Sequence, residues 1–364
     1  MKKILLSICT ALFIISAPLA AFEWGGLITN ETGITTPDFA DITFNQADGI
    51  SFWINSPIGE NFALSGEASY KFRFTKAKNA DPAITHIADL PLLKIAGDVN
   101  TESGILSINA GRFSYVDGTA AVYSNTLDGL SIDYALSTLK FGAVVGYTGL
   151  LNSLAVGLPS ENDNKVYNMA YGFLPVGAYV DFSLFANQTL ALQLYGILDF
   201  ASDAQKYYYA NLILSGPITN SIFYSLASSF GFIDFKDMMN YSSLSLIAFP
   251  TQLISINAGV DFTSAEGQGP FSAFYSLASS AGGKITPKLG LTFATSKMSF
   301  DLGGRYNLVY TDSSYKGAEA EVNTGFVYNI FSDFQIGLNF KATIDPEFSA
   351  NSNYVANLNL ALAF

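Results

Sequence analysis

Few residues in this chain combine the types needed for catalysis. His86 is the only histidine and Cys9 the only cysteine in 364 residues. A lipase- or protease-like barrel enzyme needs a histidine as general base. His86 has Asp81 and Asp89 nearby in the sequence, but no serine stands out as its nucleophile. The pattern is more typical of a solvated histidine in a loop, predicted over residues 75–88. We therefore expect no catalytic residue and no enzyme activity.

A carboxylate metal site has one candidate segment. Glu161, Asp163 and the neighbouring Asn162 and Asn164 supply oxygen ligands of the kind that calcium prefers. Their spacing matches no known calcium loop, so an exposed acidic loop is the favoured interpretation. A single histidine also cannot form a histidine-based zinc site. No glycine-rich phosphate loop is present, and we expect neither a metal nor a cofactor.

The composition is apolar and poor in charge. Hydrophobic residues make up 49% of the chain and charged residues 13%, whereas soluble domains carry about 25% charge. Beyond residue 21, no run of about 18 apolar residues exists, so a helical membrane protein is excluded. The net charge of −12 argues against binding of nucleic acid by general electrostatics.

The first 21 residues have the pattern of a secretory signal peptide. Lys2 and Lys3 precede an apolar stretch over residues 4–15, and small residues follow at positions 16–21. We expect export through the inner membrane, with cleavage after Ala20 or Ala21. The predicted organisation is a signal peptide over 1–21 and one domain over 22–364. That domain has no cysteine, which excludes disulfides and thiol chemistry.

Alternation with a period of two dominates the rest of the chain. From Phe334 to Ile344, apolar residues occupy every second position and polar or small residues lie between them. Similar segments of about 10 to 13 residues recur, whereas strands of soluble proteins average about 5 or 6 residues. Short turns alternate with long polar loops, as in outer-membrane barrels. The prediction is an all-β fold, a transmembrane antiparallel up-and-down β-barrel of about 18 strands. Counts of 16 to 20 stay open because residues 264–284 read as a loop or as a further strand.

The last strand carries the most specific signal. Its apolar face includes Tyr354, Leu358, Leu360, Leu362 and the terminal Phe364. It resembles the terminal strand of bacterial outer-membrane β-barrel proteins, which the barrel assembly machinery recognises. Together with the signal peptide and the alternation, the whole mature chain resembles the porin-like class.

A closer resemblance, to spirochaete outer-membrane barrels, rests on residues 22–26 and on the Gly111-Arg112-Phe113 segment. These resemblances imply an outer-membrane location, with outer-membrane lipid and the assembly machinery as partners.

Polar faces of the predicted strands supply the candidate pore lining. The charged candidates are Glu67, Lys71, Arg73, Asp133, Lys140, Asp181, Asp199, Asp261, Lys288, Asp301, Arg305, Glu319, Glu321 and Lys341. Eight acidic residues against six basic residues make a nearly balanced lumen. We expect a water-filled pore for passive diffusion of small hydrophilic solutes. The remaining negative charge falls in loops and favours a weak cation preference.

Two alternative functions stay open. A surface adhesin or structural barrel would act through external loops such as residues 150–172. A substrate-specific channel would carry aromatic side chains in its lumen, but only Tyr179 and Tyr195 are predicted to point inward. The oligomeric state is also open, with a trimer as one alternative.

Overall fold

The computed structural model describes residues 22–37, 41–148, 173–199, 206–235, 237–264, 283–311, 314–345 and 352–364. These residues form eighteen strands in a single sheet. The strands are β1 (Glu23–Pro37), β2 (Thr43–Ile58), β3 (Phe62–Ala77), β4 (Ala83–Asn100), β5 (Ile105–Val116), β6 (Ser124–Ala135), β7 (Leu139–Tyr147), β8 (Phe173–Ser183), β9 (Thr189–Asp199), β10 (Lys206–Thr219), β11 (Ile222–Ile233), β12 (Asp237–Thr251), β13 (Ile254–Thr263), β14 (Lys284–Ala294), β15 (Met298–Thr311), β16 (Ser314–Asn329), β17 (Phe334–Ile344) and β18 (Asn353–Ala363).

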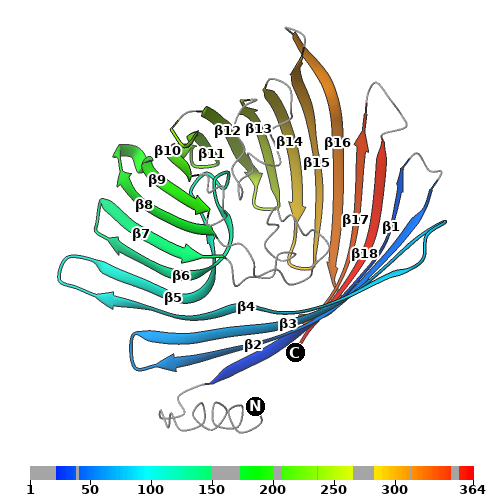
Figure 1. The fold of residues 1–364 in the computed structure, drawn as a ribbon, viewed down its shortest axis with the longest axis horizontal. Helices are drawn as coiled ribbons and strands as arrows, with labels where there is room; N and C mark the ends of the chain where they lie inside the picture. The colour runs from blue at the N-terminus through cyan, green and yellow to red at the C-terminus, as the bar shows by residue number, and fades with distance from the viewer. Residues whose placement is uncertain are drawn as a thin grey trace.

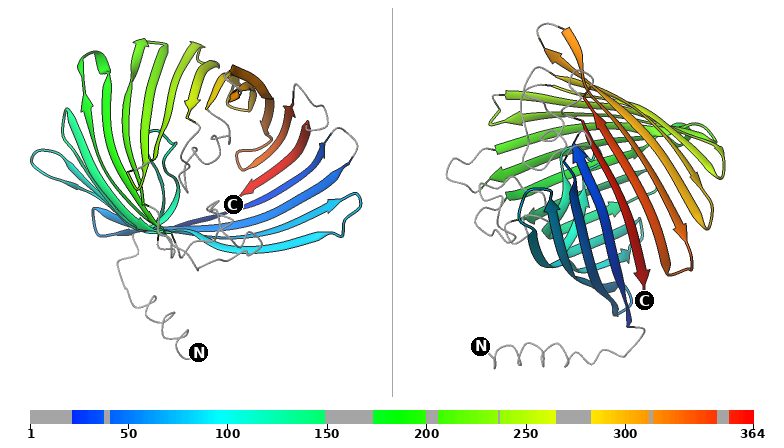
Figure 2. Two further views of the ribbon diagram at one scale, coloured as in Figure 1. Left: turned by 45° about the horizontal axis from the view of Figure 1, so that its top comes forward. Right: turned by 90° about the vertical axis from the view of Figure 1, so that its right-hand side faces the viewer.

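The sheet closes on itself. Each strand pairs antiparallel with the next along the chain, and β1 also pairs with β18, so that the first and last strands lie side by side (Figure 1). The prediction of an up-and-down barrel of 18 strands is thereby confirmed. Closure leaves no free sheet edge, which would otherwise expose unpaired backbone groups. Figure 2 shows the strands arranged in a ring.

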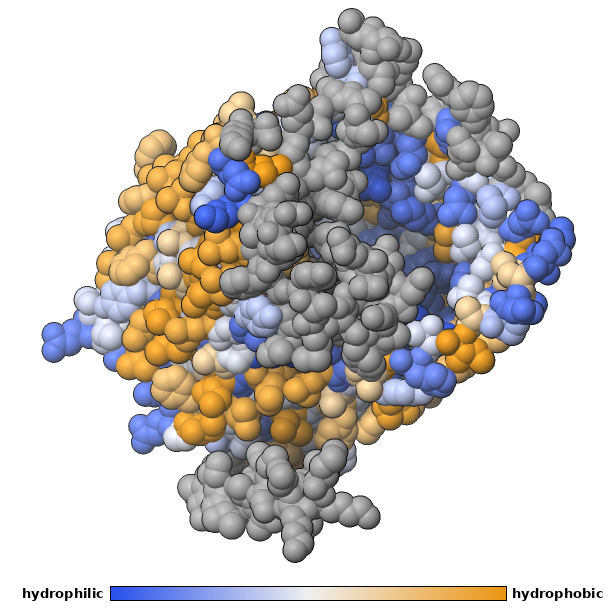
Figure 3. Space-filling model, viewed as in Figure 1, coloured by the Kyte–Doolittle hydropathy of each residue, from blue (hydrophilic) through white to orange (hydrophobic). Residues whose placement is uncertain are grey.

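Alternate residues of each strand point to opposite walls of the barrel. On β17, Leu338 and Phe340 keep 53% and 41% of their surface exposed on the outside, whereas Asn339 and Lys341 occupy the positions that point inward. The same division holds at most strand positions around the barrel, with a polar exception on the outer wall of β1–β4. Figure 3 shows hydrophobic residues gathered over the outside of the strands and hydrophilic residues in the hollow. This inverted pattern is the one expected of a barrel in an apolar solvent.

Several strands run further than the sequence pattern predicted. The predicted loop over residues 75–88 is wrong: β3 continues to Ala77 and β4 starts at Ala83. Likewise, β1 runs to Pro37 and β2 begins at Thr43 through polar residues of the same kind. Polar Thr, Asn and Lys residues near the strand ends keep the alternation and the backbone ladder, although their polarity suggests a loop. Nearly all of the ambiguous segment 264–284 lies outside the described residues.

The closing seam between β1 and β18 is tight at its end. The N–H of Gly26 donates to the carbonyl of Phe364 at 2.9 Å, and the N–H of Phe364 donates to the carbonyl of Gly26 at 3.0 Å. The Phe364 ring covers Gly26 so closely that a Cβ at position 26 would lie 2.3 Å from the ring. The terminal aromatic residue therefore takes part in closure as well as in the predicted assembly signal.

We predict that Gly26→Ala weakens closure of the barrel. The added methyl group displaces the Phe364 ring, and overpacking of this kind costs about 1–3 kcal/mol. The matched control is Gly304→Ala, where the nearest neighbouring atom is 3.5 Å from the new Cβ. Urea unfolding of the refolded barrel, followed by tryptophan fluorescence, measures the difference. Equal midpoints for the two variants would contradict the role given to the seam.

Candidate functional site

The inner wall carries the charged residues that the sequence predicted to line a pore. Thirteen of the fourteen predicted residues occupy strand positions of inward orientation and are described with their side chains, and Asp199 ends β9 with a side chain outside the described part. Their function as pore lining stays a prediction. Their placement follows from the alternation, since a shift of one residue would turn each of them toward the outside.

Part of this lining forms ion pairs across neighbouring strands. Lys288 Nζ lies 2.8 Å from Asp261 Oδ1. Glu321 Oε2 accepts from both Arg305 at 2.8 Å and Lys341 at 2.7 Å. These contacts join β13 to β14 and β15 to β17, so the charges on this side of the barrel largely neutralise one another.

Other polar contacts of the lining involve uncharged partners. Thr292 donates to Asp301 at 2.6 Å, and Asn307 donates to Glu319 at 3.2 Å. Tyr179 donates to Asp133, and the ammonium of Lys140 lies 5.4 Å from the centre of the Tyr179 ring. In the described residues, Asp181 Oδ1 is buried without a hydrogen-bond partner.

Near the β1–β18 seam, a few strands further round the barrel, the lumen carries cationic groups that form no ion pair within the described residues. Lys71 and Arg73 lie two residues apart on the inward face of β3, and both side chains are exposed. No ion pair joins either of them to an acidic side chain in the described part of the chain. Glu67 lies on the same face of β3, closer to the turn at residues 59–61. This wall therefore presents free charge to the interior.

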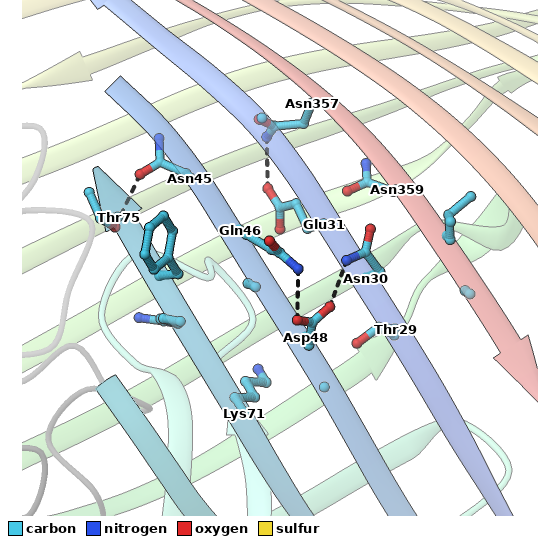
Figure 4. Close-up of a pocket in the computed structure, with 17 residues that line it drawn as sticks. Thr29, Asn30, Glu31, Asn45, Gln46, Asp48, Lys71, Thr75, Asn357 and Asn359 are labelled. Atoms are coloured by element: carbon cyan, nitrogen blue, oxygen red, sulfur yellow. Dashed lines mark hydrogen bonds between the residues drawn. The ribbon is translucent and has the colours of Figure 1, made fainter. Parts of the chain in front are cut away.

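A pocket of about 590 Å³ opens on this wall, between β18, β1, β2 and β3. Glu31 accepts a hydrogen bond from Asn357 across the seam at 2.7 Å, and Thr75 donates to Asn45 at 3.2 Å. Figure 4 shows these residues together with Lys71. The side chains at the inward positions of this pocket combine one carboxylate, Glu31, with two cationic groups and several amides, and Asp48 borders the pocket as a second carboxylate. The pocket can therefore hydrogen-bond small polar solutes in either charge state.

A connecting segment, residues 117–123, folds into the barrel and narrows it. We refer to it as the constriction loop. Ala121, Val122 and Tyr123 are almost fully buried, with 1%, 0% and 1% of their surface exposed. They pack against inward side chains of β9, β10 and β12, including Tyr195, Tyr209 and Met239. In the ribbon, this loop between β5 and β6 lies within the ring of strands (Figure 1).

Asp117 holds the constriction loop in place. Its carboxylate accepts hydrogen bonds from the N–H groups of Thr119, Val122 and Tyr123 at 2.8–3.1 Å. Asn211 of β10 also donates to it, at 3.1 Å. Burial raises the pKa of Asp117, and the hydrogen bonds from the loop partly oppose that effect.

A second contact joins the loop to the wall at Gly118, whose N–H donates to Gln193 Oε1 at 3.0 Å. A Cβ at that position would lie 2.5 Å from the Gln193 side chain. The close approach explains why a glycine follows Asp117. Together the two contacts attach the constriction loop to β9 and β10.

Sequence reasoning missed most of the aromatic residues inside the barrel. Beyond the predicted Tyr179 and Tyr195, the interior holds Tyr115, Tyr123, Tyr207, Tyr209 and Tyr241. The hydroxyl groups of Tyr115 and Tyr195 lie 2.5 Å apart. For the four tyrosines that lie in strands, the alternate positions they occupy were the signal that could have found them, whereas Tyr123 lies in the constriction loop. The sequence pattern led us to expect charged residues at inward positions. On these strands the inward residues are aromatic instead, and they pack against the constriction loop.

His86 lies in β4 and not in a loop. Its Nδ1 is 2.6 Å from the hydroxyl of Tyr70, and its ring contacts Phe72. All three belong to the outer wall, away from the inner-wall carboxylates. Among the described residues, no group of three His, Cys, Asp or Glu side chains could hold a metal ion. The segment with Glu161 and Asp163 lies outside the described residues, as does the loop over 150–172.

Within the described part of the chain, no helix is both long enough and apolar enough to cross a membrane.

Comparison with known proteins identifies the fold but no close relative. No family model matches the chain, and no curated protein matches it in sequence. Solved structures do match over almost the full length. A BenF-like porin from Pseudomonas fluorescens is similar with a TM-score of 0.66 and 11% identity, covering 96% of this chain and 100% of that one.

Two further solved structures agree with this match. OccAB4 of Acinetobacter baumannii has a TM-score of 0.60 at 10% identity, covering 95% of this chain and 98% of the other. OpdK of Pseudomonas aeruginosa, solved with vanillate, has a TM-score of 0.56 at 12% identity, covering 94% and 98%. The chain thus has the fold of outer-membrane porin barrels. The closer resemblance to spirochaete barrels stays a prediction.

We predict that Asp117→Ala releases the constriction loop and widens the pore. Loss of the carboxylate leaves the N–H groups of Thr119, Val122 and Tyr123 without their acceptor, so the buried loop conformation loses its main support. Single-channel conductance should rise about 1.5- to 3-fold, because the loop occupies part of the conducting cross-section.

The control is Asp81→Ala, which removes the same charge from an exposed turn outside the barrel. Unchanged conductance in Asp117→Ala would show that the constriction loop does not limit the pore.

Proposed function

We propose that this protein is an outer-membrane channel through which small hydrophilic solutes diffuse passively. The observation that carries the proposal is a closed barrel whose outer wall is apolar and whose inner wall is polar. A barrel of 16 to 18 strands normally encloses an aqueous channel. The solved porins of the same fold support this assignment, as does the predicted signal peptide over residues 1–21. No step of the proposed activity needs a catalytic residue.

The proposed pore prefers cations weakly. The chain holds 30 acidic residues against 18 basic residues, and the inner wall adds Glu31, Asp89 and Asp98 to the predicted acidic lining. Among the described residues, Lys94 and Lys284 add two basic groups on that wall. A net negative field raises the local concentration of cations. The pairs at Asp261 and Glu321 weaken the field, so the preference is small.

A second candidate, a substrate-selective channel, is favoured by two features of the lumen. The constriction loop and the inward tyrosines make a narrow, partly aromatic section. Lys71 and Arg73 offer free cationic groups on the opposite wall. Together they suit a small solute with an aromatic or apolar part and an anionic group. OpdK was solved with a compound of that kind, vanillate.

We predict an open, conducting pore in planar lipid bilayers. In a salt gradient, the reversal potential should favour cations. A current that reverses at a potential favouring anions would contradict the proposed selectivity. A protein that inserts but conducts no ions would contradict the channel itself and favour the alternative of an adhesin or structural barrel.

We also predict that Lys71 and Arg73 set part of the selectivity. The double change of Lys71→Gln and Arg73→Gln should raise the cation-to-anion permeability ratio about two- to threefold, because it removes two free positive charges from the lumen. Vanillate added to one side should produce current blockades in the unchanged protein and fewer in this variant.

Lys78→Gln serves as the control for charge, since Lys78 lies at the exposed end of the barrel, 3.7 Å from Asp41. If vanillate blocks the double variant and the unchanged protein equally, the pore does not select solutes through this wall.

A further inference from the structure

A cluster of polar side chains lies on the outer wall of the barrel. Asn30 donates to Asp48 Oδ1 at 2.6 Å, and Gln46 donates to Asp48 Oδ2 at 2.9 Å. Thr32 donates to Asn30 Oδ1 at 3.2 Å. Figure 4 shows the two hydrogen bonds that converge on Asp48. No ion pair joins Asp48 to a basic side chain in the described part of the chain.

The strand register establishes that the cluster points outward. Asn30 is opposite Asp48, and Thr32 is opposite Gln46, with no register shift along the β1–β2 pair. The same alternate positions hold Ile28, Ile34, Phe44 and Ile50, which expose 45%, 44%, 36% and 47% of their surface. The inward positions between them hold Glu31, Asn45 and most of the other pocket residues, and Asn30, Gln46 and Asp48 border the same pocket as their neighbours on β1 and β2.

The cluster lies within the apolar belt and not at its rim. On β2, Asp48 is four residues from the outward Phe44 and four residues from the outward Phe52. At the rise and tilt of a barrel strand, each of these rings is about 10 Å from Asp48 along the membrane normal. Lipid chains at that depth supply no hydrogen-bond donor, and polar groups facing them are costly. A carboxylate held there by two amides therefore indicates contact with another protein surface.

An imidazole lies on the same wall at a matching position. Asp48 is opposite Phe72 on β3, and Phe72 is opposite His86 on β4. One strand thus separates the carboxylate from the imidazole. His86 contacts the Tyr70 hydroxyl, and no acidic side chain lies within ion-pair distance of it in the described residues. The outer wall of β1–β4 therefore carries a carboxylate and an imidazole that are complementary to each other, but β3 keeps them apart within one copy of the chain.

We propose that this patch, formed by Asn30, Thr32, Gln46, Asp48, Tyr70 and His86, is the contact between two copies of this chain in the membrane. A contact about a two-fold axis is self-complementary, because residue i of one copy meets residue j of the other and the reverse. With the axis near β3, the β2 strand of one copy faces the β4 strand of its partner. The carboxylate side of each patch then meets the imidazole side of the other, and the amides supply further donors and acceptors.

Cysteine cross-linking tests this contact in the full-length protein. Cys9, in the predicted signal peptide, is the only cysteine of the chain, so one introduced thiol gives an unambiguous probe. Phe72→Cys places it on the outer wall between Asp48 and His86. Leu246→Cys places it on the outer wall of β12, where Leu246 is 39% exposed. Both variants are reconstituted into phosphatidylcholine vesicles at a low protein-to-lipid ratio and oxidised with copper phenanthroline.

We expect a covalent dimer from Phe72→Cys and at least fivefold less from Leu246→Cys. The proposal is overturned if neither variant forms a dimer or if both form it equally. Oxidation in the native outer membrane adds a second test: a cross-link to a different protein instead of the dimer would show that the partner is not a second copy and would overturn the proposal.

Removal of the cluster tests whether its polarity holds the contact. In the Phe72→Cys background, the combined changes Asn30→Leu, Gln46→Leu and Asp48→Leu should abolish the dimer while the refolded variant still forms a conducting pore. If that variant fails to fold, Asp48→Asn alone should reduce the dimer at least threefold. A dimer yield that stays the same would overturn the proposal. The proposal rests on an outer wall that faces lipid, so a conducting protein without cross-linking refutes the contact and leaves the proposed channel intact.

Discussion

Backbone hydrogen bonding in an apolar surrounding is the constraint on which the rest of this structure depends. Each N–H and C=O group that faces an apolar layer without a partner costs several kcal/mol. A sheet meets that requirement only when its two edges pair with each other. In this chain the pairing of β1 with β18 does so, from Leu27 opposite Ala363 to Pro37 opposite Asn353. The terminal Phe364 extends the closure through its two hydrogen bonds with Gly26.

Because the sheet is closed, each strand has one face on the outer wall and one face on the inner wall, and the two faces require different side chains. The outer wall needs apolar side chains, and the inner wall is free to carry charge. Charged residues are distributed unevenly over the inner wall. Near β13–β17 its charges are paired, as at Glu321 with Arg305 and Lys341. Near β1–β3 they are free, and near β9–β12 they are replaced by tyrosines beneath the constriction loop. The proposed filtering of solutes follows from this asymmetry.

Much of the fold was predictable because period-two alternation reports directly on the two walls. The count of 18 strands and the inward orientation of residues such as Glu321 and Lys341 followed from it. The constriction loop did not, because its burial depends on the contacts of Asp117 with Asn211, 94 positions away. A local pattern contains no information on such a contact. His86 was misplaced for a related reason: polar neighbours suggested a loop, whereas the backbone ladder of β4 continues through them.

The measurement that tests the central claim most directly is cysteine accessibility along β17. Single cysteines at positions 336 to 343, in the protein reconstituted in lipid vesicles, are treated with a maleimide that does not cross membranes. We predict labelling with a period of two. Odd positions, which include Asn339 and Lys341, react from the water-filled lumen, and even positions, which include Leu338 and Phe340, are protected by lipid. Uniform labelling, or labelling of the even positions alone, would contradict a membrane barrel with an aqueous interior.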